Sequence, residues 1–349
     1  MVAAALMSAA TLYAEYKTGY YDAMDGTQRE SLKEAAKTCV AEHSTLLYSD
    51  LPNYWVLSDT YPERYDGCLR FWDMYSDEMY LIQNNQTGKQ AFSANKMQRE
   101  HMVPKSWWKK GNDVEYTPAY SDMWNLYPSD GPANQAKSNY PLGLVDQATF
   151  DNGVSKVGTP QAGLGGGCKS VFEPADEYKG DFARAVFYMA TVYDDLPWKY
   201  TYMFKTETWP TLQPWAVEML LDWARRDPVS QKETDRNDAV EQCQGNRNPY
   251  IDFPLLAEYV WGNRTAETFH LRDQGGDVEG IDAGEGPAYE IDGGVVSILR
   301  DSDTPLCIFD TTGRLLLRVE TPRAGTRHRL PADCLLIVTS GSKAEKHLH

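Results

Sequence analysis

The sequence has little of several features that would place it in a common class of protein. Its 349 residues include only six cysteines and six histidines. No two cysteines form a C-x-x-C pair, so neither a zinc knuckle nor a thiol redox motif is indicated. The apolar run at residues 1–14, MVAAALMSAATLYA, is too short to cross a bilayer, and we expect no transmembrane segment. With 42% hydrophobic residues, the chain is long enough for one large core or two smaller ones, which indicates a globular protein.

The apolar run at residues 1–14 has the form of a signal peptide's hydrophobic region. It ends in a small residue before the polar Glu15, although no basic segment precedes it. The alternative is an apolar helix that packs on the core. We favour the signal peptide, which predicts a secreted or cell-surface protein. Export would permit disulfides, and Cys307 with Cys334 could staple the C-terminal segment.

The charge balance excludes unspecific adhesion to nucleic acid. The formal net charge is −16, so contact with a polyanion must be confined to a basic patch. Residues 95–110 provide such a patch, because they hold five basic side chains against one acidic one. The sequence therefore allows a local site for a polyanion on an otherwise acidic protein.

The single acidic residue of this patch, Glu100, stands directly before His101. A carboxylate is the kind of oxygen ligand that Mg²⁺ prefers, and an imidazole can take up a proton near neutral pH. The alternative is a surface loop with ordinary solvated charges. Adjacent residues of a regular strand face opposite sides of a sheet, so a joint role for this pair predicts a position at a strand end or bulge.

Periodicity gives a coarse outline of the secondary structure. Apolar residues at helical spacing predict core helices over residues 27–43, 182–193 and 214–223. Residues 48–80 are rich in aromatics, Pro and Asp, and predict short strands and ordered loops. A short strand over residues 123–128 is expected to precede a helical turn over residues 132–139, where Pro132 suits the first turn.

Three segments taken together resemble the bacterial endonuclease I family. They are REHMVPKSWW, SDMWNLYPSDGPANQAKSNYPLG and QGNRNPYIDFP, and they occur in the family's order. The similarity extends from about residue 20 to about residue 261, and its early part resembles the Bacteroidetes form of the family. This family consists of secreted, non-specific nucleases of the ββα-metal, or His-Me finger, class. The resemblance therefore implies an α+β fold with a ββα-metal finger at its core.

The resemblance also implies roles for individual residues. Glu100 and Asn134 match the family's metal ligands, for Mg²⁺ or alternatively Mn²⁺ or Ca²⁺, and His101 matches its general base. The implied reaction is hydrolysis of phosphodiester bonds in DNA, and in RNA as a further substrate, to products with 5′-phosphates.

The chain departs from the family pattern at two places, and the departure at Trp124 leaves an alternative open. Many members have a histidine where this chain has Trp124, which we regard as a neighbour of the site. The family's phosphate-binding arginine also has no counterpart between His101 and Asn134. The weak substrate contacts predicted in its place are Arg99, Lys105, Lys109, Lys110 and Lys137. The alternative is a catalytically impaired surface protein that binds nucleic acid or glycan.

Composition divides the chain into domains. We expect the nuclease domain over residues 15–265, an acidic, Gly-rich linker over 266–288, and a small β-sandwich over 289–345. The last segment resembles the C-terminal sorting modules of proteins exported across the outer membrane of Bacteroidetes, which would make the export machinery a partner. A plain structural or adhesive β domain is the alternative. We expect a monomer.

Overall fold

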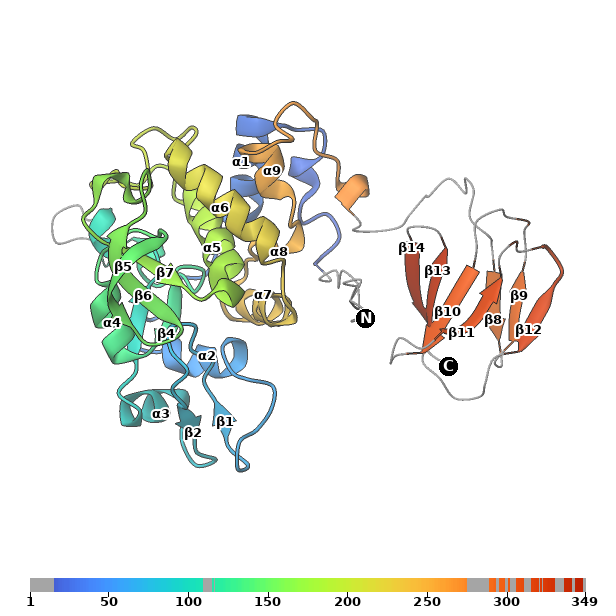
Figure 1. Ribbon diagram of the computed structural model, residues 1–349, viewed down its shortest axis with the longest axis horizontal. Coiled ribbons are helices and arrows are strands. Elements are labelled where there is room, and N and C mark those ends of the chain that lie inside the picture. The colour runs from blue at the N-terminus through green and yellow to red at the C-terminus, as the bar shows by residue number, and fades with distance from the viewer. Residues whose placement is uncertain are drawn as a thin grey trace. The chain divides into compact units, whose positions relative to one another are not determined.

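The computed structural model describes residues 16–108, 115 and 117–274, and the strands and some turn residues between 289 and 347. The chain divides into two compact units, of which the first ends at Gly276 and the second runs from Asp277 to His349. Helices and several small sheets make up the first unit, and strands make up the second (Figure 1). The predicted α+β class is confirmed. No described helix is both long enough and apolar enough to cross a membrane.

The helices of the first unit include those predicted from periodicity. The helix expected over residues 27–43 is α1, and α5 and α6 match the other two. The nine described α-helices are α1 (Arg29–Val40), α2 (Leu51–Ser58), α3 (Gly88–Ala94), α4 (Gly131–Lys137), α5 (Lys179–Val192), α6 (Pro214–Arg226), α7 (Gln231–Gln244), α8 (Pro249–Asp252) and α9 (Leu256–Val260).

Helix α2 was not expected, because the composition of residues 48–80 favours strands and loops. Leu51, Trp55 and Ser58 are buried and recur at helical spacing, and Pro52 occupies the first turn. The prediction of strands and loops is therefore wrong for residues 51–58, which form a helix, although it holds for a strand later in the same stretch. Two short strands follow the helix, β1 (Leu69–Arg70) and β2 (Leu81–Ile82).

Helix α5 forms the centre of the first unit. All of its residues after Lys179 are buried, which is expected of a helix that is apolar on nearly every side. Helix α6 packs along it, and α1 and α8 also contact it (Figure 1). The one arginine of α5, Arg184, is paired in the interior with Glu233 of α7, with 2.7 Å between Nη2 and Oε2. It is therefore not available to a substrate.

A ββα finger lies beside this helical core. Strand β3 (Gln98–His101) pairs antiparallel with β4 (Leu126–Ser129), so that Glu100 lies opposite Tyr127 and His101 opposite Leu126. Helix α4 follows β4 after one residue, Asp130, whose side chain caps the helix by accepting the Ala133 N–H at 2.8 Å. The predicted strand and helical turn are thus confirmed, although the strand begins at Leu126. A three-stranded antiparallel sheet of β5 (Val145–Asp151), β6 (Ser155–Pro160) and β7 (Val171–Pro174) follows in sequence.

The described part of the second unit consists of strands and turns, in the stretch where a small β-sandwich was predicted. Its strands group into two antiparallel sheets, in the orders β11-β10-β13-β14 and β12-β9-β8. They are β8 (Tyr289–Asp292), β9 (Val295–Ile298), β10 (Leu306–Asp310), β11 (Leu315–Val319), β12 (Arg327–Arg329), β13 (Leu336–Ser340) and β14 (Lys343–His347).

The first unit reaches further than the predicted domain boundary at residue 265. Phe269 is fully buried, forms a β-bridge with Thr27 and donates its backbone N–H to the Thr27 carbonyl at 2.8 Å. Residues 266–274 therefore belong to the packed nuclease unit and not to a linker. The predicted signal peptide, residues 275–288 of the predicted linker, and Cys334 lie outside the described residues. Cys39, Cys68, Cys168 and Cys243 are all free thiols.

Candidate active site

The predicted base and both predicted metal ligands line one cavity of about 420 Å³. Glu100 and His101 reach it from β3, and Asn134 reaches it from α4. Arg99 and Lys105 also line it. The other lining residues are Tyr48, Pro104, Ser106, Ser138 and Asn139. Residues that are far apart in the sequence thus converge on the predicted pair.

Glu100 and His101 lie at the end of a strand, as a joint role requires. His101 is the last residue of β3, and each of the two residues is only 5% exposed. The chain turns directly after His101, and Asn125 holds this turn with its side chain. The Asn125 amide accepts the Val103 N–H at 2.8 Å and donates to the Val103 carbonyl at 3.0 Å. The Met102 N–H also donates to the Asn125 backbone carbonyl at 2.9 Å, so one backbone hydrogen bond continues the pairing before the Asn125 side chain binds Val103.

His101 has a defined tautomer. Its Nε2 lies 2.9 Å from the backbone carbonyl of Tyr120. A carbonyl can only accept, so in the neutral ring the hydrogen must sit on Nε2, and Nδ1 keeps a free lone pair. Burial lowers the pKa of His101 to about 3, although the hydrogen bond to the Tyr120 carbonyl acts to raise it. The imidazole is therefore neutral near pH 7, the state in which a general base must rest.

Glu100 is paired with Lys137, which was predicted to be a weak substrate contact. The Lys137 ammonium is fully buried and lies 2.5 Å from Glu100 Oε1 and 3.3 Å from the His101 carbonyl. Burial raises the pKa of Glu100, and the nearby lysine opposes that rise. A fully buried ammonium cannot reach a phosphate in the cavity, so the prediction for Lys137 is wrong.

Asn134 completes a set of oxygen donors. It is half-buried on α4, and its backbone N–H donates to the Asp130 carbonyl at 3.0 Å. Its side-chain amide makes no hydrogen bond to any other described residue. The described residues also contain no group of three or more His, Cys, Asp or Glu side chains that could hold a metal. One carboxylate and one amide oxygen fit a hard divalent cation that takes its remaining ligands from water and substrate.

Arg99 is the best placed of the predicted substrate contacts. Its guanidinium lies 5.1 Å from the ring centroid of Tyr48 and 5.2 Å from that of Phe92, and Nη2 donates to the Ser49 carbonyl at 3.3 Å. The Lys105 ammonium lies 5.1 Å from the Tyr120 ring. Lys109 and Lys110 lie outside the described residues.

Polar and aromatic lining residues were missed by sequence reasoning. The Tyr48 and Tyr120 rings stack with centroids 4.6 Å apart, and the Tyr48 ring is nearly parallel to the His101 ring at 5.9 Å. Ser106 Oγ and Arg99 Nε are buried without a hydrogen-bond partner among the described residues. Tyr48 comes from a loop far upstream of His101, and no spacing in the sequence connects the two.

Trp124 was predicted to neighbour the site, and the structure corrects this. Its side chain is 1% exposed, does not line the cavity, and packs in the core against Tyr188 with ring centroids 5.9 Å apart. The Arg236 guanidinium lies 5.1 Å from its ring and also donates to the Met123 carbonyl at 2.8 Å. Trp124 therefore fills core volume and helps to hold the start of β4.

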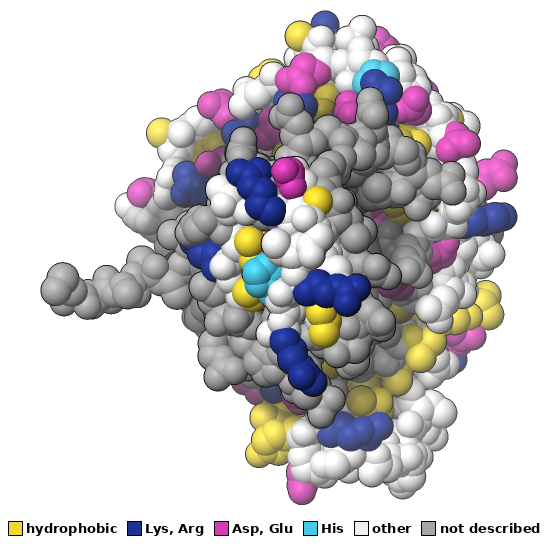
Figure 2. Space-filling view, turned by 90° about the vertical axis from the view of Figure 1, so that its right-hand side faces the viewer, with side chains coloured by type: hydrophobic (Ala, Val, Ile, Leu, Met, Phe, Trp, Pro, Cys, Tyr) yellow, Lys and Arg dark blue, Asp and Glu magenta, His cyan; other side chains and the backbone are white. Residues whose placement is uncertain are grey.

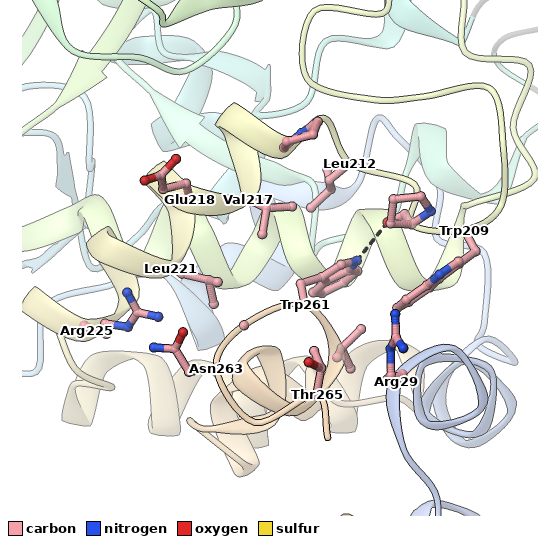
Figure 3. Close-up of a pocket in the computed structure, with 14 residues that line it drawn as sticks. Arg29, Trp209, Leu212, Val217, Glu218, Leu221, Arg225, Trp261, Asn263 and Thr265 are labelled. Atoms are coloured by element: carbon pink, nitrogen blue, oxygen red, sulfur yellow. Dashed lines mark hydrogen bonds between the residues drawn. The ribbon is translucent and has the colours of Figure 1, made fainter. Parts of the chain in front are cut away.

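A larger cavity, of about 600 Å³, lies between α6 and the segments around Trp209 and Trp261 (Figure 3). Trp261 Nε1 donates to the Pro210 carbonyl at 2.8 Å across its floor. No histidine is found among its described lining residues, and Arg225 at its edge is already paired with Glu258, with Nε 2.7 Å from Oε1. The larger cavity therefore lacks a histidine beside an oxygen ligand, which favours the smaller one as the candidate active site.

Charge is distributed unevenly over the surface. Figure 2 looks from the side on which Figure 1 draws the strands of the second unit, and it shows several Lys and Arg side chains around a histidine near the centre of that view. The net charge of −16 is therefore compatible with local positive regions.

Two antiparallel strands and a helix, with a histidine, a carboxylate and an amide around one cavity, define the ββα-finger class of nucleases. Residues 28–255 match the sequence pattern of Endonuclease I. The chain belongs to the endonuclease I family, as its three motifs predicted, and it is a nuclease.

Several curated relatives are similar over most of their length. An extracellular ribonuclease of Bacillus amyloliquefaciens is 30% identical over 245 residues, which cover 69% of this chain and 78% of that protein. Endonuclease-1 of Buchnera aphidicola subsp. Baizongia pistaciae is 28% identical over 211 residues, covering 54% and 74% of the two chains. An extracellular deoxyribonuclease of Aeromonas hydrophila is 26% identical over 178 residues, covering 47% and 69%.

Proposed function

We propose that the protein is a secreted, Mg²⁺-dependent endonuclease that hydrolyses DNA and RNA to products with 5′-phosphates. The observation that carries the proposal is the state of His101. A neutral imidazole, with Nε2–H directed to the Tyr120 carbonyl, presents Nδ1 as a base in the same cavity as Glu100 and Asn134.

His101 is the residue that moves a proton. Its Nδ1 takes a proton from the water that attacks the phosphorus, while the hydrogen bond to Tyr120 holds the ring and stabilises the imidazolium that forms. Parallel contact with the Tyr48 ring limits rotation of the imidazole. The base is therefore oriented before a substrate arrives.

Glu100 and Asn134 would hold the divalent cation. When bound, the cation supplies stabilisation of the negative charge that develops on the phosphate and on the leaving oxygen. With only two protein oxygens, the site relies on phosphate oxygens to complete the ligand set, which is usual for Mg²⁺.

Arg99, Lys105 and Ser106 are the proposed substrate contacts. All three line the cavity. Arg99 Nε and Ser106 Oγ are buried and have no hydrogen-bond partner among the described residues, which leaves their hydrogen-bonding capacity unused. Arg99 is fixed between two aromatic rings, which reduces the entropy lost on binding. It supplies a guanidinium where the family's usual arginine is missing.

The alternative of a catalytically impaired binding protein rested on Trp124. Because Trp124 packs in the core and away from the cavity, its presence leaves the base and the oxygen donors undisturbed. The names of the relatives support both substrates and the location, since they include extracellular ribonucleases and deoxyribonucleases and a periplasmic deoxyribonuclease. Export through the C-terminal unit is part of the proposal.

The test is degradation of plasmid DNA and of a structured RNA by the purified protein with Mg²⁺, with EDTA, and with His101→Ala. His270→Ala is a matched control, because His270 lies outside the cavity beside Asp25, at 3.4 Å. We expect turnover only by the wild type and the control, and only with metal. A folded wild-type protein without turnover, or an active His101→Ala variant, would contradict the proposal.

A further inference from the structure

Lys137 stands in an unusual place for a lysine. Its side chain is fully buried, and its ammonium contacts Glu100 Oε1 at 2.5 Å and the His101 carbonyl at 3.3 Å. The ammonium also lies over the Phe172 ring, 5.9 Å from the ring centroid, and the ring covers it on that side. Glu100 is its one acidic partner among the described residues.

The same helix delivers this lysine and one of the proposed metal ligands. Asn134 and Lys137 are three residues apart on α4, and side chains at that spacing share a helix face. When α4 docks on β3, it therefore brings an amide oxygen and an ammonium to the same carboxylate. Lys137 occupies one oxygen of Glu100, and the other remains for a cation.

A buried carboxylate without a positive partner is strongly destabilising. In a finger that depended on its metal, the cation would supply that partner, and the finger would fold only when the cation was bound. Here a lysine supplies it permanently. The two positive charges must then share Glu100 when the cation arrives.

We infer that Lys137 is an internal cation that keeps the finger folded without metal and weakens metal binding by competing for Glu100. The inference rests on the proposed function, because it takes Glu100 as a metal ligand. In this role Lys137 positions Glu100 and does not touch the substrate. Because Lys137 weakens metal binding by the protein alone, most of the affinity for the cation comes from the phosphate oxygens of the bound substrate.

The experiment uses Mn²⁺ as the probe, without nucleic acid, and measures free Mn²⁺ by electron paramagnetic resonance. We expect Lys137→Met to bind Mn²⁺ at least about tenfold more tightly than the wild type, because removal of a neighbouring positive charge favours a second cation. Lys137→Arg keeps the charge and should bind close to the wild-type level. A residue with a merely structural role would give weaker binding on removal, so the direction of change separates the two.

Thermal unfolding in EDTA and in Mn²⁺ gives a second readout. The wild type should unfold at nearly the same temperature in both, whereas Lys137→Met should unfold earlier in EDTA and regain stability with Mn²⁺. Lys33→Met is a matched control, since Lys33 is also fully buried and paired with an aspartate, Asp194, but lies outside the cavity. That variant should lose stability equally in both conditions.

If Lys137→Met does not fold in either condition, Lys137→Gln replaces it, because the Gln amide can still donate to Glu100 without carrying a charge. Unchanged or weaker Mn²⁺ binding by the folded variant overturns the inference, and so does absence of Mn²⁺ binding by every variant. Failure of the proposed function is seen separately, as absence of metal-dependent cleavage by the wild type.

Discussion

The helical core and the finger both bury charged side chains, but they do so differently. In the core, Arg184 is paired with Glu233. Arg247 donates from Nε and Nη2 to the two carboxylate oxygens of Asp252, each at 2.8 Å. In the finger, Glu100 is held by a lysine, and Arg99 Nε and Ser106 Oγ lack partners among the described residues. These two arginines each bind both oxygens of their carboxylate, whereas Lys137 binds one oxygen of Glu100. The two arginine pairs serve stability, and the pair in the finger keeps one carboxylate oxygen for binding.

The sharpest test of this contrast is His101→Ala. It should lower the cleavage rate about 10²- to 10⁴-fold, because a general base is removed, while the urea midpoint of unfolding changes little. Steady-state cleavage of a fluorescent oligonucleotide measures the rate. If His101→Ala instead lowered the urea midpoint strongly, together with the rate, His101 would serve stability in the way that the paired side chains of the core do.

Arg184→Met should affect stability and leave catalysis intact, because it leaves Glu233 buried without its partner. The free energy of unfolding should fall by about 3–5 kcal/mol, with the cleavage rate per folded molecule unchanged. Urea unfolding measures the loss. The double variant Arg184→Met/Glu233→Gln should regain much of the stability, because the unpaired charge is then gone.

Trp124→His introduces the histidine that many family members carry. We expect a loss of about 3 kcal/mol in stability, since the change removes core volume and buries a polar ring. The cleavage rate of the folded fraction should not rise. A clear gain in rate would place residue 124 in the site, against its packing here.

Arg99→Ala should raise KM about tenfold and affect kcat less, because a charged hydrogen bond to the substrate is lost. Arg99→Lys keeps the charge but not the planar group held between Tyr48 and Phe92. It should therefore restore only part of the affinity. Steady-state kinetics at two salt concentrations would separate the charge from the geometry, and full restoration by lysine would argue against a fixed guanidinium.

The smallest effect concerns Asp73, where the core meets the finger. Asp73 accepts the backbone N–H of Asp130, the residue that caps α4, at 3.0 Å. Burial raises its pKa to about 7, so the folded state holds the proton more tightly than the unfolded state does. Its contribution to stability is present below the unfolded pKa and is lost as the pH rises through about 7.

Asp73→Asn should therefore reduce the fall in unfolding midpoint between about pH 5 and about pH 8. Urea titrations of both proteins across this range measure the change. An unchanged pH dependence would show that Asp73 is not a source of it.

Sequence motifs predicted the strand pair, helix α4, and the convergence of Glu100, His101 and Asn134, because each depends on local spacing or on the family pattern. Burial was not predictable in the same way. Lys137 reads as one more basic residue of the patch, and only the docking of α4 on β3 makes it internal. Trp124 was misplaced for the same reason. Tyr48 was missed because the tertiary fold alone brings its loop to the cavity.

The bridge between Thr27 and Phe269 joins the beginning and the end of the nuclease unit at one place. The path of the chain through this unit is therefore nearly a closed loop, and the cavity residues all lie between the two joined points. What is attached after Gly276 can be exchanged, shortened or lost without removing a residue that lines the cavity. The set of residues that line the cavity is therefore independent of the sequence of the second unit.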